Sequence, residues 1–425
     1  MNVAIACGIL LACFAINLPV FIGVLTAILS YFFLANDASP IIAVQRVVGA
    51  GENITLLAIP FFVMLGHLLN HTGITRRMLR LAEVLTGHFA GGLAHANVLL
   101  STMMGGMSAS NLADCAMLTK MLVPEMERLG YNKAYSAAVT AAGSLITPII
   151  PPGIALIIYG YVADVSIGKM FMAGVIPGIL CCVALMISIV IVAKKRNYKP
   201  IRTQAPTPGE VWVAFKECFW GLLLVIVIIG GIRMGVFTPS EAGAIAVVYA
   251  IIVGMFVYKE MKFSDIKVAL METARSTAGI MLIIMACSAF AWLLTWEQVA
   301  QGVAVALTTF SKNPWVFLLM LNVLLLILGM FIEGNAAIIV LVPLLMPTVR
   351  ELGIDQIQFG IIMILNLAIG CLTPPMGTVM FISTQITGLS VREFVKEMWP
   401  SFWALMITLA LVTIFPSIST FLPNY

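Results

Sequence analysis

TPIIPPG at residues 147–153 and LTPPMG at residues 372–377 interrupt two otherwise hydrophobic segments, and their double prolines lie 223 residues apart. A proline inside a helix removes a backbone hydrogen bond and clashes with the preceding turn, so each stretch predicts a broken helix. Paired interruptions in corresponding hydrophobic segments of two halves are typical of inverted-repeat transporters. The two stretches therefore predict a duplicated membrane protein whose functional site lies where the breaks meet.

Other residues repeat at the same spacing without a gap. The pairs are Gly106-Met107 with Gly329-Met330, Ala113 with Ala336, Pro124 with Pro347, Leu129-Gly130 with Leu352-Gly353, and Pro177 with Pro400. We therefore expect residues 1–193 and 218–425 to be two copies of one unit. Residues 194–217 are rich in lysine and arginine and contain two prolines, which predicts a cytoplasmic linker between the copies.

The composition is that of a polytopic membrane protein. Of the 425 residues, 61% are hydrophobic and 10% are charged, and apolar stretches of spanning length recur from end to end. Residues 1–36 carry no charge, so the basic region of a cleavable signal peptide is missing and we expect the N-terminus to remain as membrane helix. A net charge of +4, without a basic run interleaved with aromatic residues, argues against nucleic acid as a partner.

Two pairs of apolar segments are shorter than the roughly 20 residues that a spanning helix needs. They are residues 89–104 and 112–124 around a tip at 105–111, and residues 313–330 and 337–348 around a tip at 331–335. We expect two re-entrant hairpins, at 89–129 and 313–350. Unpaired backbone is not tolerated in hydrocarbon, so both tips are expected to be buried in protein or to line a wet cavity.

Five crossings and one hairpin per copy turn the second copy upside down, because five is odd. With both termini outside, 17 of the 23 Lys and Arg residues fall on the inner face, in agreement with the positive-inside rule. The charged amphipathic segments 74–88 and 262–276 are predicted to be helices along the membrane surface. The predicted fold class is an all-α polytopic membrane protein built as an inverted repeat.

Small hydroxyl and amide side chains gather at the tips and breaks. They are Ser108, Ser110, Asn111, Thr147, Asn335, Asn366, Thr373 and Thr378. At such breaks, free carbonyls suit a hard cation and free amides suit an anion. Neutral oxygen ligands suit sodium better than a transition metal. Small polar residues also serve simple helix packing, but their twofold occurrence at the breaks favours two cation sites.

Two acidic residues lie near the tips, where a charge at membrane depth is costly and usually functional. Asp114 follows the first tip, and Glu333 lies within the second. Both are candidate substrate contacts. Both also fit a structural role in which the carboxylate caps the first amides of a hairpin leg.

Motifs for enzymes and transition metals are lacking. The eight cysteines form no C-x-x-C pair, and neither H-E-x-x-H nor a phosphate-binding loop occurs. His67 and His71 stand four residues apart, but no third ligand is near them in the sequence. An intramembrane enzyme and a passive channel for organic anions remain as alternatives to transport. A channel would need a continuous polar face, whereas polar residues here are concentrated at four breaks.

Six stretches carry a family resemblance. They are GGMSASNLAD at 105–114, LVPEM at 122–126, TPIIPPGI at 147–154, FMAGVIPG at 171–178, FTPSEAGA at 237–244 and LTPPMG at 372–377. Together they resemble the large membrane subunit of the tripartite ATP-independent periplasmic (TRAP) transporters, which belong to the ion-transporter superfamily. The resemblance covers essentially the whole chain.

The resemblance implies a secondary transporter of the bacterial inner membrane with both termini in the periplasm. A transport domain that carries the hairpins would move like an elevator against a scaffold, and an inward Na⁺ gradient would drive it without any other cofactor. A periplasmic substrate-binding protein would deliver a small organic acid, such as a C4-dicarboxylate or an acidic sugar like sialic acid. A small four-helix membrane subunit would complete the complex.

The resemblance also implies site residues. The cation-holding positions are Ser108, Ser110, Asn111, Gly143 and Pro148 in the first copy, and Gly334, Asn335, Thr373, Met376 and Gly377 in the second. The candidate substrate contacts are Ser108, Asn111, Asp114, Glu333 and Thr378. Family members often carry glycine where this chain has Ala109 and a small residue where it has Asn111. The Asn111 amide is able to donate a hydrogen bond to a sugar hydroxyl or a carboxylate.

Overall fold

The computed structural model describes residues 2–16, 18–34, 39–108, 110–302, 305 and 313–424, and every regular element in this part of the chain is a helix. The helices before the linker are α1 (Asn2–Ala15), α2 (Val20–Leu34), α3 (Pro40–Gly51), η1 (Ile54–Leu57), α4 (Ala58–Thr72), α5 (Ile74–Thr86), α6 (Gly92–Ser108), α7 (Asn111–Arg128), α8 (Lys133–Ser144), α9 (Ile154–Val162) and α10 (Ile167–Arg196). Those after it are α11 (Pro208–Arg233), α12 (Pro239–Ile252), η2 (Val253–Val257), α13 (Phe263–Trp296), α15 (Pro314–Gly329), α16 (Gly334–Glu351), α17 (Gln356–Gly370), α18 (Thr378–Thr387), α19 (Val391–Ile414) and α20 (Ser417–Asn424).

The predicted fold class, an all-α polytopic membrane protein, is confirmed. Seven helical stretches among the described residues are long and apolar enough to cross a membrane, and four shorter apolar helices accompany them. One hydrophobic core runs through both halves of the chain.

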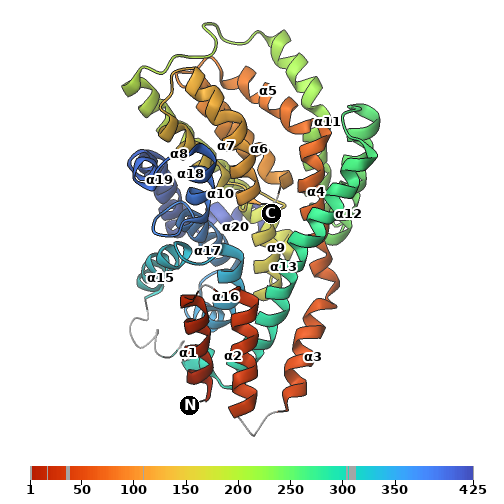
Figure 1. Cartoon of the computed structure of the whole chain (residues 1–425), viewed down its shortest axis with the longest axis vertical. Coiled ribbons are helices and arrows are strands. Elements are labelled where there is room, and N and C mark those ends of the chain that lie inside the picture. The colour runs from red at the N-terminus through yellow and green to blue at the C-terminus, as the bar shows by residue number, and fades with distance from the viewer. Residues whose placement is uncertain are drawn as a thin grey trace.

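Equivalent helices of the two halves start at nearly the same spacing. The pairs are α6 with α15, α7 with α16, α8 with α17, α9 with α18, and α10 with α19. The first residues of α7 and α16, Asn111 and Gly334, are 223 residues apart, like the double prolines. Figure 1 shows α6 and α7 in the upper half of the molecule and α15 and α16 in the lower half, so the two hairpins approach each other from opposite ends.

Polar contacts join segments that the topology places on the same membrane face. On the face predicted to be cytoplasmic, here called the basic face, the pairs are Arg77–Glu260 at 2.7 Å, Arg80–Glu217 at 2.8 Å and Arg196–Glu397 at 2.6 Å. On the opposite face, the Ser240 hydroxyl donates to the Ile54 carbonyl at 3.0 Å and the Tyr31 hydroxyl donates to Glu297. Exposed ion pairs contribute little stability. They do show which segments lie on the same face, and this agrees with the predicted order of crossings.

The prediction of a separate surface helix at residues 262–276 is wrong. These residues form the first part of α13, which runs unbroken from Phe263 to Trp296. At 1.5 Å per residue, its 34 residues extend about 51 Å, well beyond a hydrocarbon core of roughly 30 Å. Charge at the start of the segment therefore marked the projecting end of a long helix rather than a helix of its own.

The equivalent stretch of the first copy is divided. There, α3 ends at Gly51, and the Asn53 side chain accepts a hydrogen bond from the Thr55 amide, which starts η1 and then α4. The second copy has Ala274 in place of Gly51 and Ser276 in place of Asn53, and the helix continues. The other predicted surface helix, at 74–88, is present as the separate helix α5.

Candidate functional site

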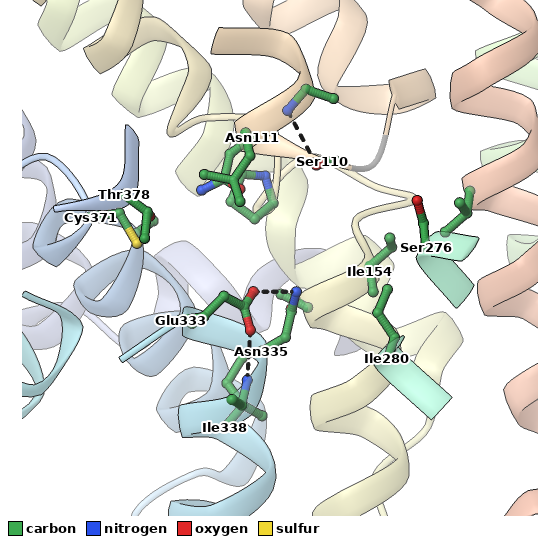
Figure 2. A pocket seen from close by; sticks show the side chains of 18 of the residues that line it. Ser110, Asn111, Ile154, Ser276, Ile280, Glu333, Asn335, Ile338, Cys371 and Thr378 are labelled. Atoms are coloured by element: carbon green, nitrogen blue, oxygen red, sulfur yellow. Dashed lines mark hydrogen bonds between the residues drawn. The ribbon is translucent and has the colours of Figure 1, made fainter. Parts of the chain in front are cut away.

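A cavity of about 440 Å³ lies between the two hairpin tips. The predicted site residues that line it are Ser110, Asn111, Asp114, Pro148, Glu333, Gly334, Asn335 and Thr378. Figure 2 shows Ser110 and Asn111 on one side of the opening and Glu333 and Asn335 facing them from the other hairpin. The fold thus brings the tips and breaks of both copies to one place, as the sequence pattern predicted.

Four helices begin at this cavity. The first residues of α7, α9, α16 and α18 all line it: Asn111, Ile154, Gly334 and Thr378. The first turn of a helix presents unpaired amides and a partial positive charge equivalent to roughly half a unit. Four such ends around one cavity favour an anion there.

The two hairpin legs carry side-chain caps. Ser110 Oγ accepts a hydrogen bond from the Ala113 amide at 3.4 Å and caps α7. At α16, Glu333 Oε2 accepts from the Ala336 amide at 3.0 Å, and its Oε1 accepts from the Asn335 side-chain amide at 2.8 Å. Glu333 therefore has the predicted capping role, and it also faces the cavity.

The two broken helices lack such caps. Gly153 precedes α9 and Gly377 precedes α18, and glycine has no side chain that could accept a hydrogen bond from the first amides. At α18 the Cys371 carbonyl accepts from the amides of Val379 and Met380 instead. The amides of residues 154–156 at the start of α9 donate to no described residue. The start of α9 is therefore the best-prepared position for a carboxylate of a ligand.

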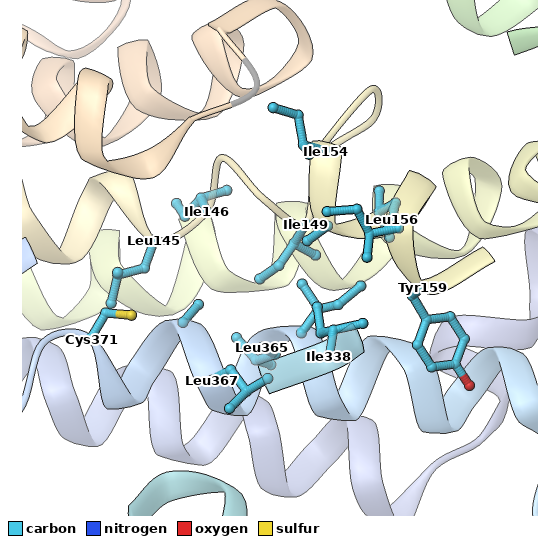
Figure 3. Packing of buried hydrophobic residues seen from close by; sticks show 14 of the residues in the cluster. Leu145, Ile146, Ile149, Ile154, Leu156, Tyr159, Ile338, Leu365, Leu367 and Cys371 are labelled. Atoms are coloured by element: carbon cyan, nitrogen blue, oxygen red, sulfur yellow. The ribbon is translucent and has the colours of Figure 1, made fainter. Parts of the chain in front are cut away.

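Hydrophobic packing behind the cavity fixes the start of α9. Figure 3 shows Ile149 and Leu156 from the first copy among Ile338 and Leu365 from the second. All four side chains are buried. Further along α9, the Tyr159 hydroxyl donates to the Gln356 carbonyl at 2.6 Å. The free amides are thus held in place by both copies.

A buried acid connects the first hairpin to the first broken helix. Asp114 lies in the first turn of α7, is 1% exposed, and accepts a 2.6 Å hydrogen bond from the Thr147 hydroxyl. A carboxylate removed from water depends on such donors. Asp114 therefore has a structural hydrogen bond, but to the Thr147 side chain rather than to the first amides of α7, where the cap is Ser110, and the residue also lines the cavity.

Several predicted cation positions do not line the cavity. Gly143 is buried in α8, Thr373 donates to the Gly370 carbonyl at 2.8 Å, and Met376 is 43% exposed. At Gly377, an added Cβ would lie 2.6 Å from the carbonyl oxygens of Cys371 and Thr373, so backbone oxygens gather at this break.

Three further points concern the oxygen donors. The side chain of Ser108 and all of Ala109 lie outside the described residues. Asn366 donates to the Asn322 carbonyl and side chain rather than to the site. Within the part of the chain that the structure describes, no three His, Cys, Asp or Glu side chains are grouped to hold a metal ion.

Sequence reasoning missed one wall of the cavity, formed by α4 and α13. It carries His67, Asn70 and Ser276, and His67 Nδ1 lies 3.0 Å from Glu272. Both helices run without a break here and have no repeated motif, so the sequence pattern pointed to His67 only as one of a histidine pair and not to this cavity. The available signal was the occurrence of His67 and Asn70 three residues apart in an apolar span, which places them on one helical face.

Comparison with known proteins supports the same assignment. Residues 7–418 match the family described as Tripartite ATP-independent periplasmic transporter, DctM component. The chain belongs to this family. The sialic acid TRAP transporter large permease protein SiaM of Vibrio cholerae is 40% identical to this DctM-family chain over 408 residues, which cover 96% of this chain and 95% of that protein.

A second relative is the C4-dicarboxylate TRAP transporter large permease protein DctM of Pseudomonas aeruginosa. It is 38% identical over 375 residues, covering 88% of this chain and 87% of that protein. The crystal structure of the YdaH transporter of Alcanivorax borkumensis has a TM-score of 0.60 and covers 88% of this DctM-family chain and 87% of its own, at 14% identity. That likeness concerns the fold. The relatives are named as transporter permeases and not as enzymes.

Proposed function

We propose that this chain is the large permease subunit that imports a small organic acid across the bacterial inner membrane. The observation that carries the proposal is the convergence of four helix N-termini on one cavity, with the amides of α9 left without partners. Amides and helix dipoles recognise a carboxylate without a buried lysine or arginine. Among the described residues that line the cavity, none is a lysine or an arginine.

Sodium is the proposed coupling ion. The tips and breaks supply neutral hydroxyl, amide and carbonyl oxygens, which are ligands of hard cations, and the repeat supplies them twice. Two cation sites are proposed, one in each copy. Their residues are Ser108, Ser110, Asn111, Gly143 and Pro148 in the first copy, and Gly334, Asn335, Thr373, Met376 and Gly377 in the second. A bound cation would also offset the charges of Asp114 and Glu333 beside an anionic substrate.

The proposed movement is of the elevator type. Hairpins and broken helices form one side of the cavity, and α4 and α13 form the other. Sliding of the first set against the second would carry the cavity from one face to the other. A small four-helix membrane subunit and a periplasmic binding protein are the proposed partners. Named relatives transport sialic acid, C4-dicarboxylates and 2,3-diketo-L-gulonate, so the proposed substrate belongs to these organic acids.

Uptake into proteoliposomes tests this function. The complex of both membrane subunits is reconstituted, the binding protein is added with a radiolabelled acid that it binds, and a sodium gradient is imposed. Accumulation above the outside concentration that needs both sodium and the binding protein is the expected result. Equilibration without sodium would instead indicate a passive channel.

A further inference from the structure

The cavity wall on α4 and α13 has hydrogen-bonding capacity that the protein itself does not use. We call His67, Asn70 and Ser276 the scaffold wall. The exposed side chains of Asn70 and Ser276 make no hydrogen bond to the described residues, and the partly buried His67 contacts Glu272 through Nδ1. Figure 2 shows Ser276 and Thr378 on opposite sides of the cavity, so the scaffold wall faces the broken helix α18 across the open space.

Glu272 determines what His67 offers to a ligand. A carboxylate only accepts hydrogen bonds, so the contact of 3.0 Å places the proton of the ring on Nδ1. The other nitrogen, Nε2, is then an acceptor in the neutral ring. The scaffold wall thus combines an acceptor at His67 with the donors and acceptors of Asn70 and Ser276.

This pattern suits hydroxyl groups. A hydroxyl donates one hydrogen bond and accepts others, so it matches both the Nε2 acceptor and the Asn70 amide. A second carboxylate only accepts, and it would meet Asp114 and Glu333 in a cavity that no lysine or arginine lines. The volume of about 440 Å³ lies within the usual range of small-ligand pockets, about 300–1,000 Å³.

We infer that the substrate is a hydroxylated organic acid, with a carboxylate at the start of α9 and hydroxyl groups on the scaffold wall. This inference rests on the proposed function, which requires only an organic acid. Within it, His67, Asn70 and Ser276 are specificity-determining residues, and Glu272 is a positioning residue that holds the tautomer of His67.

Direct binding to the purified complex of both membrane subunits, in sodium buffer and without the binding protein, tests the inference. The probes are succinate, malate and tartrate, which share a four-carbon diacid skeleton and differ in hydroxyl number, and N-acetylneuraminate. We expect affinity to rise roughly threefold to tenfold with each matched hydroxyl. His67→Phe should remove most of this preference by lowering tartrate binding more than succinate binding, because only tartrate loses hydroxyl contacts.

Matched variants separate recognition from general damage. His67→Gln retains an acceptor and should keep most of the preference, and His71→Phe, one turn along α4 and outside the cavity lining, should keep all of it. Ser276→Ala should lower tartrate binding, whereas Ser264→Ala on the same helix should not. Glu272→Leu should lower the ratio of tartrate to succinate affinity without changing succinate binding, a result that general loss of structure would not give.

The outcomes distinguish the two proposals. Equal affinity for succinate and tartrate in the native complex would overturn the inference and leave the import of an organic acid intact. So would equal weakening of all probes by His67→Phe and His71→Phe. If none of the four acids binds, the inference fails, and the uptake assay with the binding protein still decides whether an organic acid is imported. If His67→Phe does not fold, the comparison of Ser276→Ala with Ser264→Ala decides.

Discussion

The Thr147 hydroxyl donates a 2.6 Å hydrogen bond to Oδ2 of Asp114 and so joins the loop between α8 and α9 to the first turn of α7. Both residues are fully or almost fully buried. The bond crosses from the first hairpin to the first broken helix, the two elements that deliver Ser110, Asn111 and Ile154 to the cavity. It therefore fixes the relative position of two of the four helix N-termini.

Thr147→Val keeps the shape of the side chain and removes this donor. We expect the free energy of unfolding to fall by about 1.5–3 kcal/mol, as for a lost hydrogen bond to a charged group, and uptake to fall with it. Thermal unfolding of the purified complex and initial uptake rates measure both effects. Thr102→Val is the control, because that hydroxyl donates to the Val98 carbonyl of its own helix and not to an acid. Equal losses in the two variants would contradict the proposed connection.

Variants of Glu333 separate its capping role from a role of its charge. Glu333→Ala removes the cap of α16 and should cost about 0.5–2 kcal/mol in the free energy of unfolding. Glu333→Gln keeps an oxygen that accepts from the Ala336 amide, so its stability should stay close to native. If the charge acts on ions or substrate, the sodium concentration for half-maximal uptake by Glu333→Gln should differ from that of the native protein even though the stability is unchanged. An unshifted curve would restrict Glu333 to capping.

Sodium activation also tests the proposed cation sites. Ser108→Ala in the first copy and Thr373→Ala in the second each remove one oxygen ligand. We expect the sodium concentration for half-maximal uptake to rise several-fold, since one hydrogen-bond-like contact is worth roughly a factor of ten or less. Ser264→Ala, at the start of α13, should leave the curve unchanged. Native sodium activation in both site variants would argue against these positions.

An amide pair holds the second hairpin to the second broken helix. Asn366 on α17 donates to Asn322 on α15, with distances of 2.7 Å to its side chain and 2.9 Å to its carbonyl. Asn366→Leu should lower the free energy of unfolding by about 0.6–1.7 kcal/mol, the range for interhelical hydrogen bonds in membranes. A double-mutant cycle with Asn322→Leu measures the pair, and additive effects would show that the bond contributes no stability.

The predictable parts of this structure are those where the sequence breaks a hydrophobic pattern. Pro151-Pro152 and Pro374-Pro375 lie between α8 and α9 and between α17 and α18. The predicted tips fall at the meeting point of the hairpin legs, but the breaks are shorter than predicted, because α6 continues to Ser108 and α16 begins at Gly334. These signals are local, because two adjacent prolines close to a glycine remove successive helix hydrogen bonds, whereas single prolines such as Pro124 and Pro177 stay inside helices. The convergence of the breaks then followed from the repeat itself.

The parts that the sequence did not predict depend on distant packing. The continuity of α13 depends on small differences between the copies, such as Ala274 at the position equivalent to Gly51. The charged residues at the start of α13 predicted a surface helix instead. His67 and Ser276 lie on uninterrupted helices, and only the approach of α4 and α13 to the hairpins gives them a cavity to line. Propensity and periodicity carry no information about such an approach.

The unpaired amides at the start of α9 belong to the main chain, and this has a consequence for how such a protein changes over generations. A point mutation exchanges a side chain but cannot delete an amide, except by introducing proline. A carboxylate contact at these amides, as proposed, would therefore survive most point mutations, whereas the side chains on α4 and α13 can be exchanged. Within this chain, a new substrate would be accommodated by changes in that wall.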